Sequence, residues 1–194
     1  TWLSATFGGE GNVYRTKRGL EKILFIGTIL LGSISLMVFI FSATIWADLK
    51  GAPFVRSRKD RIETMLKFAE IKPCTRVLEL GSGDGTLLIK AAKLGAYAEG
   101  IEINPFLVWW SKQKIKRLGV ADLVHITRAD IFHASLAEKH PDVVFLYLLP
   151  STFKKLKEKF VTELPVGTRI ISNAFHIGGL TPIVQENNVY VYHL

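Results

Sequence analysis

The chain has 194 residues, 48% of them hydrophobic, and carries a formal net charge of +8. This length suits one compact domain with an appendage and excludes two full domains. The single cysteine, Cys74, excludes an intramolecular disulfide, and no histidine stands at a metal-ligand spacing from it, so no zinc site is expected. The basic charge is compatible with nucleic acid, anionic lipid or an acidic partner.

A long uncharged segment occupies residues 23–47. At about 1.5 Å per residue it reaches roughly 37 Å, enough to cross a hydrocarbon core of about 30 Å with some tilt. Trp46 stands near one end, where interfacial aromatics are common. A core helix apolar on every side would need a larger protein around it, and a cleaved signal peptide has a shorter apolar region. We therefore predict one transmembrane helix, with a hairpin or an interfacial segment as alternatives.

The chain is expected to have four parts. Residues 1–19 are predicted to form a flexible tail, residues 20–48 the transmembrane helix, residues 49–72 a linker and a lid helix, and residues 73–194 a folded domain. Ser57 is expected to cap the helix that follows the linker.

The folded domain alternates between strand and helix patterns. Strands are predicted over residues 75–80, 96–102, 123–128, 142–149 and 168–175, followed by a closing pair around Glu186-Asn187-Asn188. Helices are predicted over residues 86–94, 105–119 and 151–164. Such alternation indicates an α/β fold, a doubly wound and mainly parallel sheet with helices on both faces and an antiparallel end.

The first strand runs directly into a glycine-rich turn that precedes a helix. The stretch is Glu79-Leu80-Gly81-Ser82-Gly83-Asp84-Gly85. Glycines let the backbone turn tightly and let a ligand approach, and ligands of doubly wound sheets lie at the carboxyl ends of the strands. The spacing is G-x-G-x-G, which differs from the G-x-G-x-x-G of dinucleotide sites.

Two acids flank this turn, Glu79 and Asp84. They would repel a diphosphate, whereas they would attract the sulfonium and ammonium groups of S-adenosylmethionine. The turn therefore predicts S-adenosylmethionine as the cofactor, and a purely structural βα turn is the alternative. The cofactor-binding residues expected here are Glu79, Gly81, Ser82, Gly83, Asp84 and Gly85.

Further cofactor-binding residues are expected at the ends of the next two strands. Glu102 ends the second strand, where an acid can accept both ribose hydroxyls; Ile103 and Asn104 follow it and are included in the site. Asp130 ends the third strand and would accept from the adenine amino group, while Ile103 and Ile131 would sandwich the ring. A helix N-cap is the alternative role for Asp130.

The fourth strand ends in an aromatic and apolar stretch that contains Tyr147 and Pro150. Both are predicted to line the site of methyl transfer, with a core tyrosine as the alternative for Tyr147. The stretch lacks the Asn or Asp followed by Pro-Pro and an aromatic that is usual in methyltransferases of adenine or glutamine amines. An apolar wall suits a lysine amine, because desolvation beside a cation favours its neutral, nucleophilic form.

These motifs resemble the seven-strand class I methyltransferases. More closely, the chain resembles the small membrane-anchored protein-lysine methyltransferases, whose mitochondrial members modify the ATP synthase c subunit and the adenine nucleotide translocase and which have prokaryotic relatives. The stretches that carry this resemblance are residues 78–86, 103–111, 142–150 and 164–175. The Asn-Pro-x-Leu-Val-Trp pattern beginning at Asn104 is the most specific of them.

The resemblance implies a seven-strand sheet whose last strand is antiparallel, with cofactor binding by Glu79, Gly81, Gly83, Glu102 and Asp130. One departure lies in the linker, where the family usually has Pro-Ser/Thr-Pro and this chain has Arg56-Ser57-Arg58. Because that linker helps to close the active site in relatives, the departure affects the expected lid and the choice of substrate.

Three further aromatic residues have expected positions. Phe54 precedes the domain and is expected to fold over the cofactor as part of a lid. Trp109 and Trp110 are adjacent on a predicted helix, where neighbouring side chains diverge, so at most one of them is expected in the core.

The favoured function is methylation of lysine side chains on a membrane or membrane-associated protein, with the lipid bilayer as a second partner and no nucleic acid. Because S-adenosylmethionine is made inside cells, the domain is expected to face the cytoplasm, or the mitochondrial matrix if the protein is organellar. A small-molecule or lipid methyltransferase is one alternative. A non-catalytic nucleotide-binding membrane adaptor is another, and a NAD-dependent oxidoreductase is disfavoured by the spacing of the turn.

Overall fold

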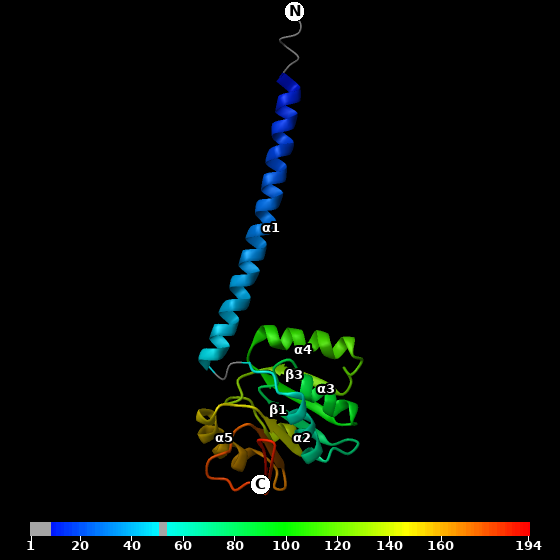
Figure 1. The fold of residues 1–194 in the computed structure, drawn as a ribbon, viewed down its shortest axis with the longest axis vertical. Helices are drawn as coiled ribbons and strands as arrows, with labels where there is room; N and C mark the ends of the chain where they lie inside the picture. Colours follow the sequence, from blue (N-terminus) through cyan, green and yellow to red (C-terminus); the bar gives the residue numbers. More distant parts are fainter. Residues whose placement is uncertain (1–8, 51–53) are drawn as a thin grey trace, which may run out of the picture. The chain divides into compact units, whose positions relative to one another are not determined.

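The computed structural model describes the backbone of residues 9–50 and 54–194, and the side chains of residues 19–42, 45 and 54–194 (Figure 1). It has two compact units, one up to Ser42 and the other from Ala43 to Leu194. The helices are α1 (Gly9–Lys50), α2 (Lys59–Ala69), α3 (Thr86–Lys93), α4 (Pro105–Arg117) and α5 (Pro150–Glu163), with a short 3-10 helix η1 (Ala137–Lys139). The strands are β1 (Arg76–Leu80), β2 (Tyr97–Glu102), β3 (Val124–Arg128), β4 (Val143–Leu146), β5 (Arg169–Asn173), β6 (Val184–Glu186) and β7 (Val189–His193).

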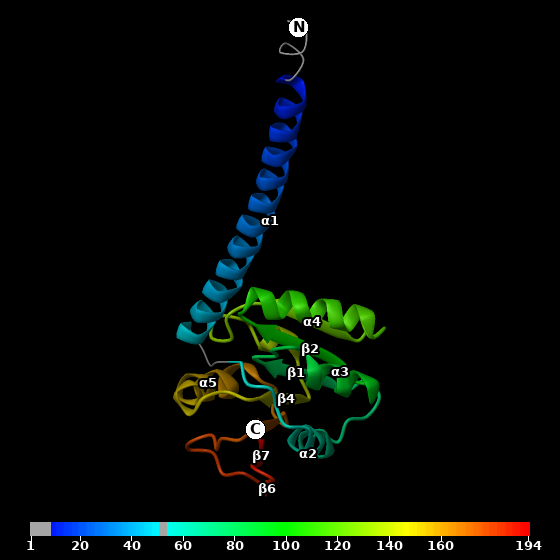
Figure 2. The same cartoon turned by 45° about the horizontal axis from the view of Figure 1, so that its top comes forward.

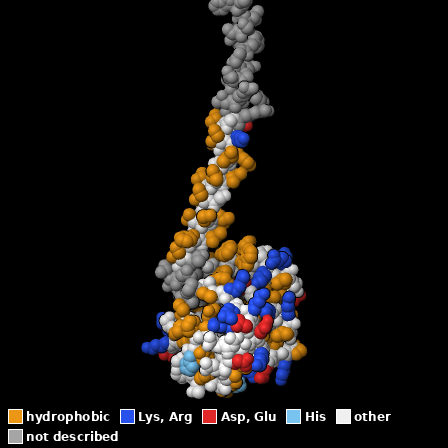
Figure 3. Space-filling view, in the orientation of Figure 1, with side chains coloured by type: hydrophobic (Ala, Val, Ile, Leu, Met, Phe, Trp, Pro, Cys, Tyr) orange, Lys and Arg blue, Asp and Glu red, His pale blue; other side chains and the backbone are white. Residues whose placement is uncertain are grey.

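The first unit is carried by α1, whose segment Gly19–Ser42 is long and apolar enough to cross a membrane. None of this segment is buried within the structure, so its large aliphatic and aromatic side chains face outward all around the helix (Figure 3). The hydroxyl groups of Thr28 and Ser33 donate to the carbonyls of Leu24 and Ile29, which satisfies them within the helix. These features are those expected of the predicted membrane helix.

The boundary of the tail differs from the expectation. Residues 9–19 belong to α1, because Arg, Lys and Glu are good helix formers and a helix that has nucleated in the apolar segment propagates at little cost. Residues 1–8, the side chain of Trp46 and residues 51–53 of the linker lie outside the described residues.

The second unit is built on one seven-stranded sheet with the order β3-β2-β1-β4-β5-β7-β6 (Figure 2). The pairs among β1 to β5 are parallel, whereas β7 is antiparallel to β5 and to β6. Asn187 and Asn188 both have positive φ, at 52° and 56°, which is the conformation of a tight two-residue hairpin loop. The predicted fold, mainly parallel with an antiparallel end, is thus confirmed.

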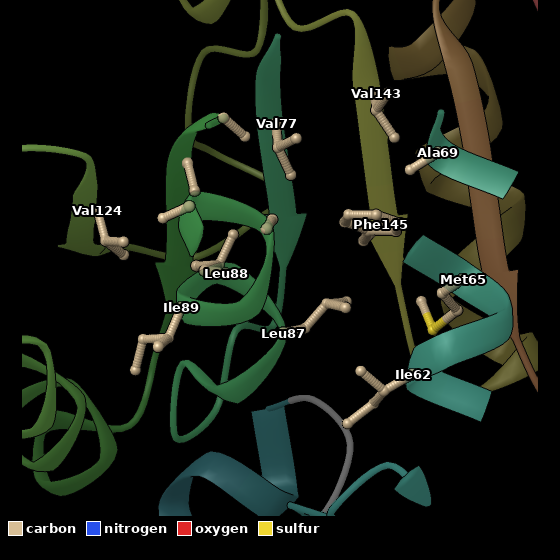
Figure 4. Packing of buried hydrophobic residues seen from close by; sticks show 14 of the residues in the cluster. Ile62, Met65, Ala69, Val77, Leu87, Leu88, Ile89, Val124, Val143 and Phe145 are labelled. Carbon is tan, nitrogen blue, oxygen red and sulfur yellow. The ribbon is translucent and has the colours of Figure 1, made fainter. Parts of the chain in front are cut away.

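Helices cover both faces of the sheet because alternate strand residues point to opposite sides. On one face, α2 and α3 pack against Val77 and Phe145 (Figure 4). On the other face, Phe153 and Phe160 of α5 pack against Leu78. The adjacent residues Val77 and Leu78 therefore serve two different cores.

Helix α2 is part of the core. Ile62, Met65 and Ala69 lie on one stripe of this helix and are buried against the sheet (Figure 4). The expected cap at Ser57 is wrong: the N-cap is Arg58 without a side-chain hydrogen bond, and the Ser57 hydroxyl accepts a hydrogen bond from the side chain of Asn173. The region assigned to a linker and lid helix thus contains a fixed helix.

Candidate functional site

The glycine turn lies at the carboxyl end of β1, between Leu80 and the start of α3. Gly81, Gly83 and Gly85 have φ of 76°, 53° and 70°, values at which a side chain costs free energy. The amides of Gly81 and Ser82 both donate to the carbonyl of Ile101 on β2, at 2.9 and 3.0 Å. The turn is therefore held against the end of the neighbouring strand.

Glu102 reaches across from the end of β2 into this turn. Its Oε2 accepts from the amide of Gly83 at 2.8 Å and its Oε1 accepts from the amide of Asn104 at 2.8 Å. Burial raises the pKa of Glu102, and the hydrogen bonds from the amides of Asn104, Gly83 and Ile103 oppose that rise. Each carboxylate oxygen keeps a further lone pair, so Glu102 can still accept hydrogen bonds from a ligand.

Glu79 lies beside the same turn and forms no ion pair with any other residue that the structure describes. Its Oε2 is buried and has no hydrogen-bond partner among the described residues. Burial, reinforced by the negative charges of Asp84 and Glu102, raises the pKa of Glu79 well above its ordinary value of 4.5, although Lys114 partly opposes this. A buried carboxylate without a partner is costly, so the site is suited to a cationic ligand.

Asp84 corrects one step of the sequence interpretation. Its carboxylate pairs with Lys114 and with Arg56, each at 3.1 Å, and accepts from the amide and hydroxyl of Thr86. Burial opposes ionisation, but the hydrogen bonds from Thr86 and Lys114 outweigh it and lower the pKa of Asp84. Of the two acids expected to attract the cofactor, Asp84 is already neutralised and Glu79 is not.

Lys114 and Arg56 were missed by the sequence analysis. The Lys114 side chain is partly buried on α4, and nothing in a single sequence links it to Asp84. Arg56 appeared only as part of an unusual linker.

Three other expected cofactor residues lie at the same edge of the sheet in different surroundings. Ser82 is buried and its hydroxyl has no partner among the described residues. Asn104 caps α4, because its Oδ1 accepts from the amides of Phe106 and Leu107 at 2.9 and 3.3 Å. Ile103, between Glu102 and Asn104, is partly exposed at the same edge.

Asp130 follows β3 and caps a turn. Its Oδ1 accepts from the amide of Phe132 at 2.9 Å, and its Oδ2 lies 3.3 Å from Nδ1 of His133. The following residues form a turn instead of the helix considered as an alternative. Ile131 is partly exposed beside it, so both residues remain accessible to a ligand at this edge.

The ends of β4 and β5 bring Tyr147 next to Phe175. Their ring centroids are 6.4 Å apart with planes at 29°, an offset stack. Phe175 follows Ala174, which has a φ of 69° that is uncommon for a residue other than glycine. Pro150 is exposed at the first turn of α5. No motif in the sequence points to Phe175, although it ends one of the stretches that carry the family resemblance.

A strap of residues 54–58 crosses the glycine turn. A Cβ built at Gly83 would lie 2.4 Å from Cε2 of Phe54, so the ring rests directly on the glycine. The strap is also held by the ion pair between Arg56 and Asp84 and by the hydrogen bond from Asn173 to Ser57. Phe54, expected in a lid over the cofactor, thus lies against the predicted cofactor turn.

The sheet order and the acid-lined glycine turn define a Rossmann-like methyltransferase fold. A solved structure of an RNA methyltransferase from Salinibacter ruber in complex with S-adenosyl-L-homocysteine is 38% identical, with a TM-score of 0.66, over 71% of this chain and 91% of that one. The family model described as the ANTKMT methyltransferase domain matches residues 79–184. The chain belongs to this family of methyltransferases.

Curated relatives agree with the family. The adenine nucleotide translocase lysine N-methyltransferase of Mus musculus is 33% identical over 68% of this chain and 56% of its own length. A protein-lysine N-methyltransferase of Saccharolobus islandicus is 33% identical over 72% of this chain and 92% of its own length. The chain therefore spans little more than half of the mouse relative and nearly all of the archaeal one.

Proposed function

We propose that this chain is an S-adenosylmethionine-dependent methyltransferase that modifies lysine side chains of a membrane or membrane-associated protein. Membership of the family and the names of the relatives from Mus musculus and Saccharolobus islandicus support the activity. The observation that carries the choice of cofactor is Glu79, whose buried Oε2 has no partner among the described residues. A cationic ligand at the turn offsets the cost of that charge.

The residues around the turn fit S-adenosylmethionine, which supplies a methyl group on a positively charged sulfur. Glu79 is suited to the ammonium end of the cofactor. Gly81 and Gly83 adopt the positive φ that the tight turn requires, and the Phe54 ring rests on Gly83. Glu102 keeps lone pairs for the ribose hydroxyls while its hydrogen bonds to backbone amides fix its orientation. We assign no direct contact to Asp84, because its charge is already paired.

The adenine end is proposed to lie between the ends of β2 and β3. Ile103 and Ile131 are both partly exposed there and offer apolar surfaces to the two faces of a ring. Asp130 uses Oδ1 for the turn, and its Oδ2, which lies 3.3 Å from Nδ1 of His133, keeps a further lone pair that can accept from an amino group. Asn104 serves this region indirectly by starting α4 where Glu102 ends β2.

The methyl acceptor is proposed to enter beside Tyr147, Phe175 and Pro150. The stacked rings of Tyr147 and Phe175 form an apolar surface along which the alkyl part of a lysine can lie. A lysine amine attacks only when neutral, and its free pKa is about 10.4. Removing the amine from water beside a positive charge lowers that pKa. Positioning and desolvation of the amine are therefore proposed to provide most of the rate enhancement.

The membrane location is also a proposal. The segment Gly19–Ser42 has the length and composition of a membrane span. A protein held at a bilayer meets membrane-associated substrates at a raised effective concentration. We propose that the methyltransferase domain faces the compartment that contains S-adenosylmethionine, either the cytoplasm or the mitochondrial matrix.

RNA methylation is a second candidate, because the similar structure from Salinibacter ruber is described as an RNA methyltransferase and this chain carries a net charge of +8. The stretch that follows β4 reads Leu148-Leu149-Pro150, without the polar residue that usually accepts a base amine. We therefore favour lysine, and the experiment below includes RNA.

The test uses the full chain in membranes of its expression host, supplied with S-adenosylmethionine that carries a tritiated methyl group. Protein, lipid and RNA are then separated and counted, and labelled protein is searched by mass spectrometry for methylated lysine. Label on lysine is expected, and Glu102→Ala is expected to abolish it, whereas Glu138→Gln, an exposed acid away from the turn, leaves it unchanged. Label confined to RNA or to lipid would overturn the lysine proposal.

A further inference from the structure

An aromatic cluster stands on the outer side of α4. Phe106, Trp109 and Trp110 have ring centroids 6.0 to 6.3 Å apart. Trp109 is 54% exposed and Trp110 is 45% exposed, which agrees with the expectation that at most one of them would lie in the core. Because both rings are large and apolar, leaving them in water forgoes a substantial hydrophobic stabilisation.

The cluster is not needed to hold α4 on the sheet. Val108, Ser111 and Ile115 recur at helical spacing and are the buried residues of this helix. The aromatic residues lie on the opposite stripe and make ring contacts with one another. The exposed rings therefore form an apolar surface on α4, and a surface of this kind is typical of a binding site for a partner outside the folded unit.

The same helix carries positive charge next to the cluster. Lys112, Lys116 and Arg117 are exposed, and the sequence of α4 contains no acidic residue. Hydrophobic and basic side chains lie side by side over this helix at the top of the folded unit (Figure 3). Tryptophan beside lysine and arginine on one helical surface is the composition of an interfacial membrane-binding helix.

We propose that this face of α4 binds the surface of an anionic lipid bilayer. Phe106, Trp109 and Trp110 would enter the headgroup region, and Lys112 and Lys116 would lie against negatively charged headgroups. The proposal adds a second membrane contact to the predicted anchor and does not depend on the identity of the methyl acceptor.

The bilayer is favoured over a protein partner by the chain itself. The candidate span ends at Ser42, and the strap that crosses the glycine turn begins at Phe54. These 12 residues would span at most about 40 Å if fully extended, and residues 43–50 belong to α1, which shortens that reach. A membrane that holds the span is therefore tethered to the folded unit, whereas a separate protein has to be bound from solution.

The contact would also orient the proposed active site. Helix α4 begins directly after Glu102, Ile103 and Asn104, so its position fixes the edge of the sheet where the cofactor is proposed to lie. Docking this helix on the bilayer would hold that edge at a constant distance from membrane-embedded acceptors.

The experiment measures the environment of the two tryptophans in the full chain. The chain has four tryptophans, and Trp2→Phe with Trp46→Phe leaves Trp109 and Trp110 as the reporters. This protein is reconstituted into phosphatidylcholine vesicles with or without phosphatidylglycerol, containing lipids brominated at a shallow acyl position. Blue-shifted emission, quenching by the brominated lipid and protection from acrylamide are expected in the anionic vesicles.

Charge variants provide the matched control. Lys112→Glu with Lys116→Glu is expected to lower the quenching in anionic vesicles at least about twofold, as is high salt. Lys72→Glu with Lys93→Glu, which reverses two exposed charges outside α4, leaves it unchanged. Circular dichroism of each variant checks the fold.

Water-like emission that brominated lipid does not quench and acrylamide does, in both kinds of vesicle, would overturn the proposal. It would also be overturned if the emission shifted only on addition of a protein or RNA. Neither outcome bears on whether lysine is methylated, so failure here is distinguishable from failure of the proposed function.

Discussion

The carboxylate of Glu102 accepts a hydrogen bond from the amide of Gly83 at 2.8 Å and so joins the end of β2 to the turn that follows β1. The amide can point toward Glu102 because Gly83 adopts a φ of 53°. With the second bond to Asn104, the carboxylate is fixed between a turn and the start of a helix. One acid therefore shapes the site and remains able to accept from a ligand.

Replacement of Glu102 by Gln separates these two roles. The side-chain amide of Gln has one oxygen that can accept from one of the two backbone N–H groups, while its own NH2 group faces the other backbone N–H group. The unfolding free energy is therefore expected to fall by about 1–3 kcal/mol. Binding of S-adenosylhomocysteine should weaken at least about tenfold, corresponding to one lost charge-assisted hydrogen bond. Denaturant titration and calorimetry measure the two effects; unchanged affinity would remove Glu102 from the cofactor site.

Glu79→Gln is expected to stabilise the ligand-free protein. Because the pKa of Glu79 is raised in the folded state, the folded protein holds its proton more tightly than the unfolded chain does. The unfolding free energy of the natural chain should therefore decline as the pH rises from 4.5 through that raised pKa. The variant should lack this decline and gain about 1 kcal/mol at neutral pH. Melting curves of both proteins across this pH range show whether the stability of the natural chain declines with rising pH and that of the variant does not.

Ligand binding should couple to the same proton. A cation beside Glu79 favours its ionised form, so binding of S-adenosylmethionine is expected to release protons at a pH below the raised pKa. Calorimetry in two buffers of different ionisation enthalpy measures the number of protons released on binding. Glu79→Gln should bind more weakly and release none, and equal proton release in the variant would show that another group is responsible.

Asp84→Asn should have the opposite effect on stability. The natural carboxylate has a lowered pKa, so it stabilises the fold above 3.8, and that contribution is lost as the pH falls through the lowered value. The substitution leaves Lys114 without its counter-charge, and a loss of about 2 kcal/mol at neutral pH is expected. Arg56→Ala should cost much less, because the Arg56 side chain is 71% exposed.

Gly83→Ala tests the contact between the strap and the turn. Alanine at this positive φ costs about 1 kcal/mol, and its Cβ would also lie 2.4 Å from Phe54. Gly119→Ala is the matched control, since Gly119 has a φ of 66° and nothing within 4 Å of the added Cβ. Both variants should lose similar backbone stability, but only Gly83→Ala should displace Phe54 and weaken cofactor binding. Equal cofactor affinity in the two would contradict a cofactor role for Gly83.

Tyr147 allows the apolar wall to be tested directly. If its ring is the active part, Tyr147→Phe should retain methyl transfer within about threefold, whereas Tyr147→Ala loses the stack on Phe175 and should fall by at least about tenfold. Initial rates at saturating cofactor provide the comparison, with cofactor affinity as the control. A large loss of the methyl-transfer rate in Tyr147→Phe would show that the hydroxyl group, and not the ring, is needed for the reaction.

The sequence by itself determined the order of elements and the type of turn. Local patterns define them: the strand before Gly81 is apolar, Pro105 starts a helix and two asparagines close the last hairpin. These signals act within a few residues, so a single chain displays them without its partners in space. Because these signals are local, they wrongly predicted Ser57 as a helix cap. Its hydroxyl group instead accepts a hydrogen bond from Asn173, which is distant in sequence.

Only the tertiary structure decided which charges are free. In sequence, Glu79 and Asp84 are equivalent acids beside one turn, but Lys114 and Arg56 arrive from two other segments and neutralise Asp84 alone. Likewise, helical spacing shows that Trp109 and Trp110 diverge, whereas the packing of α4 on the sheet leaves both exposed. Charge pairing and burial depend on contacts between distant segments, and those contacts exist only once the chain has folded.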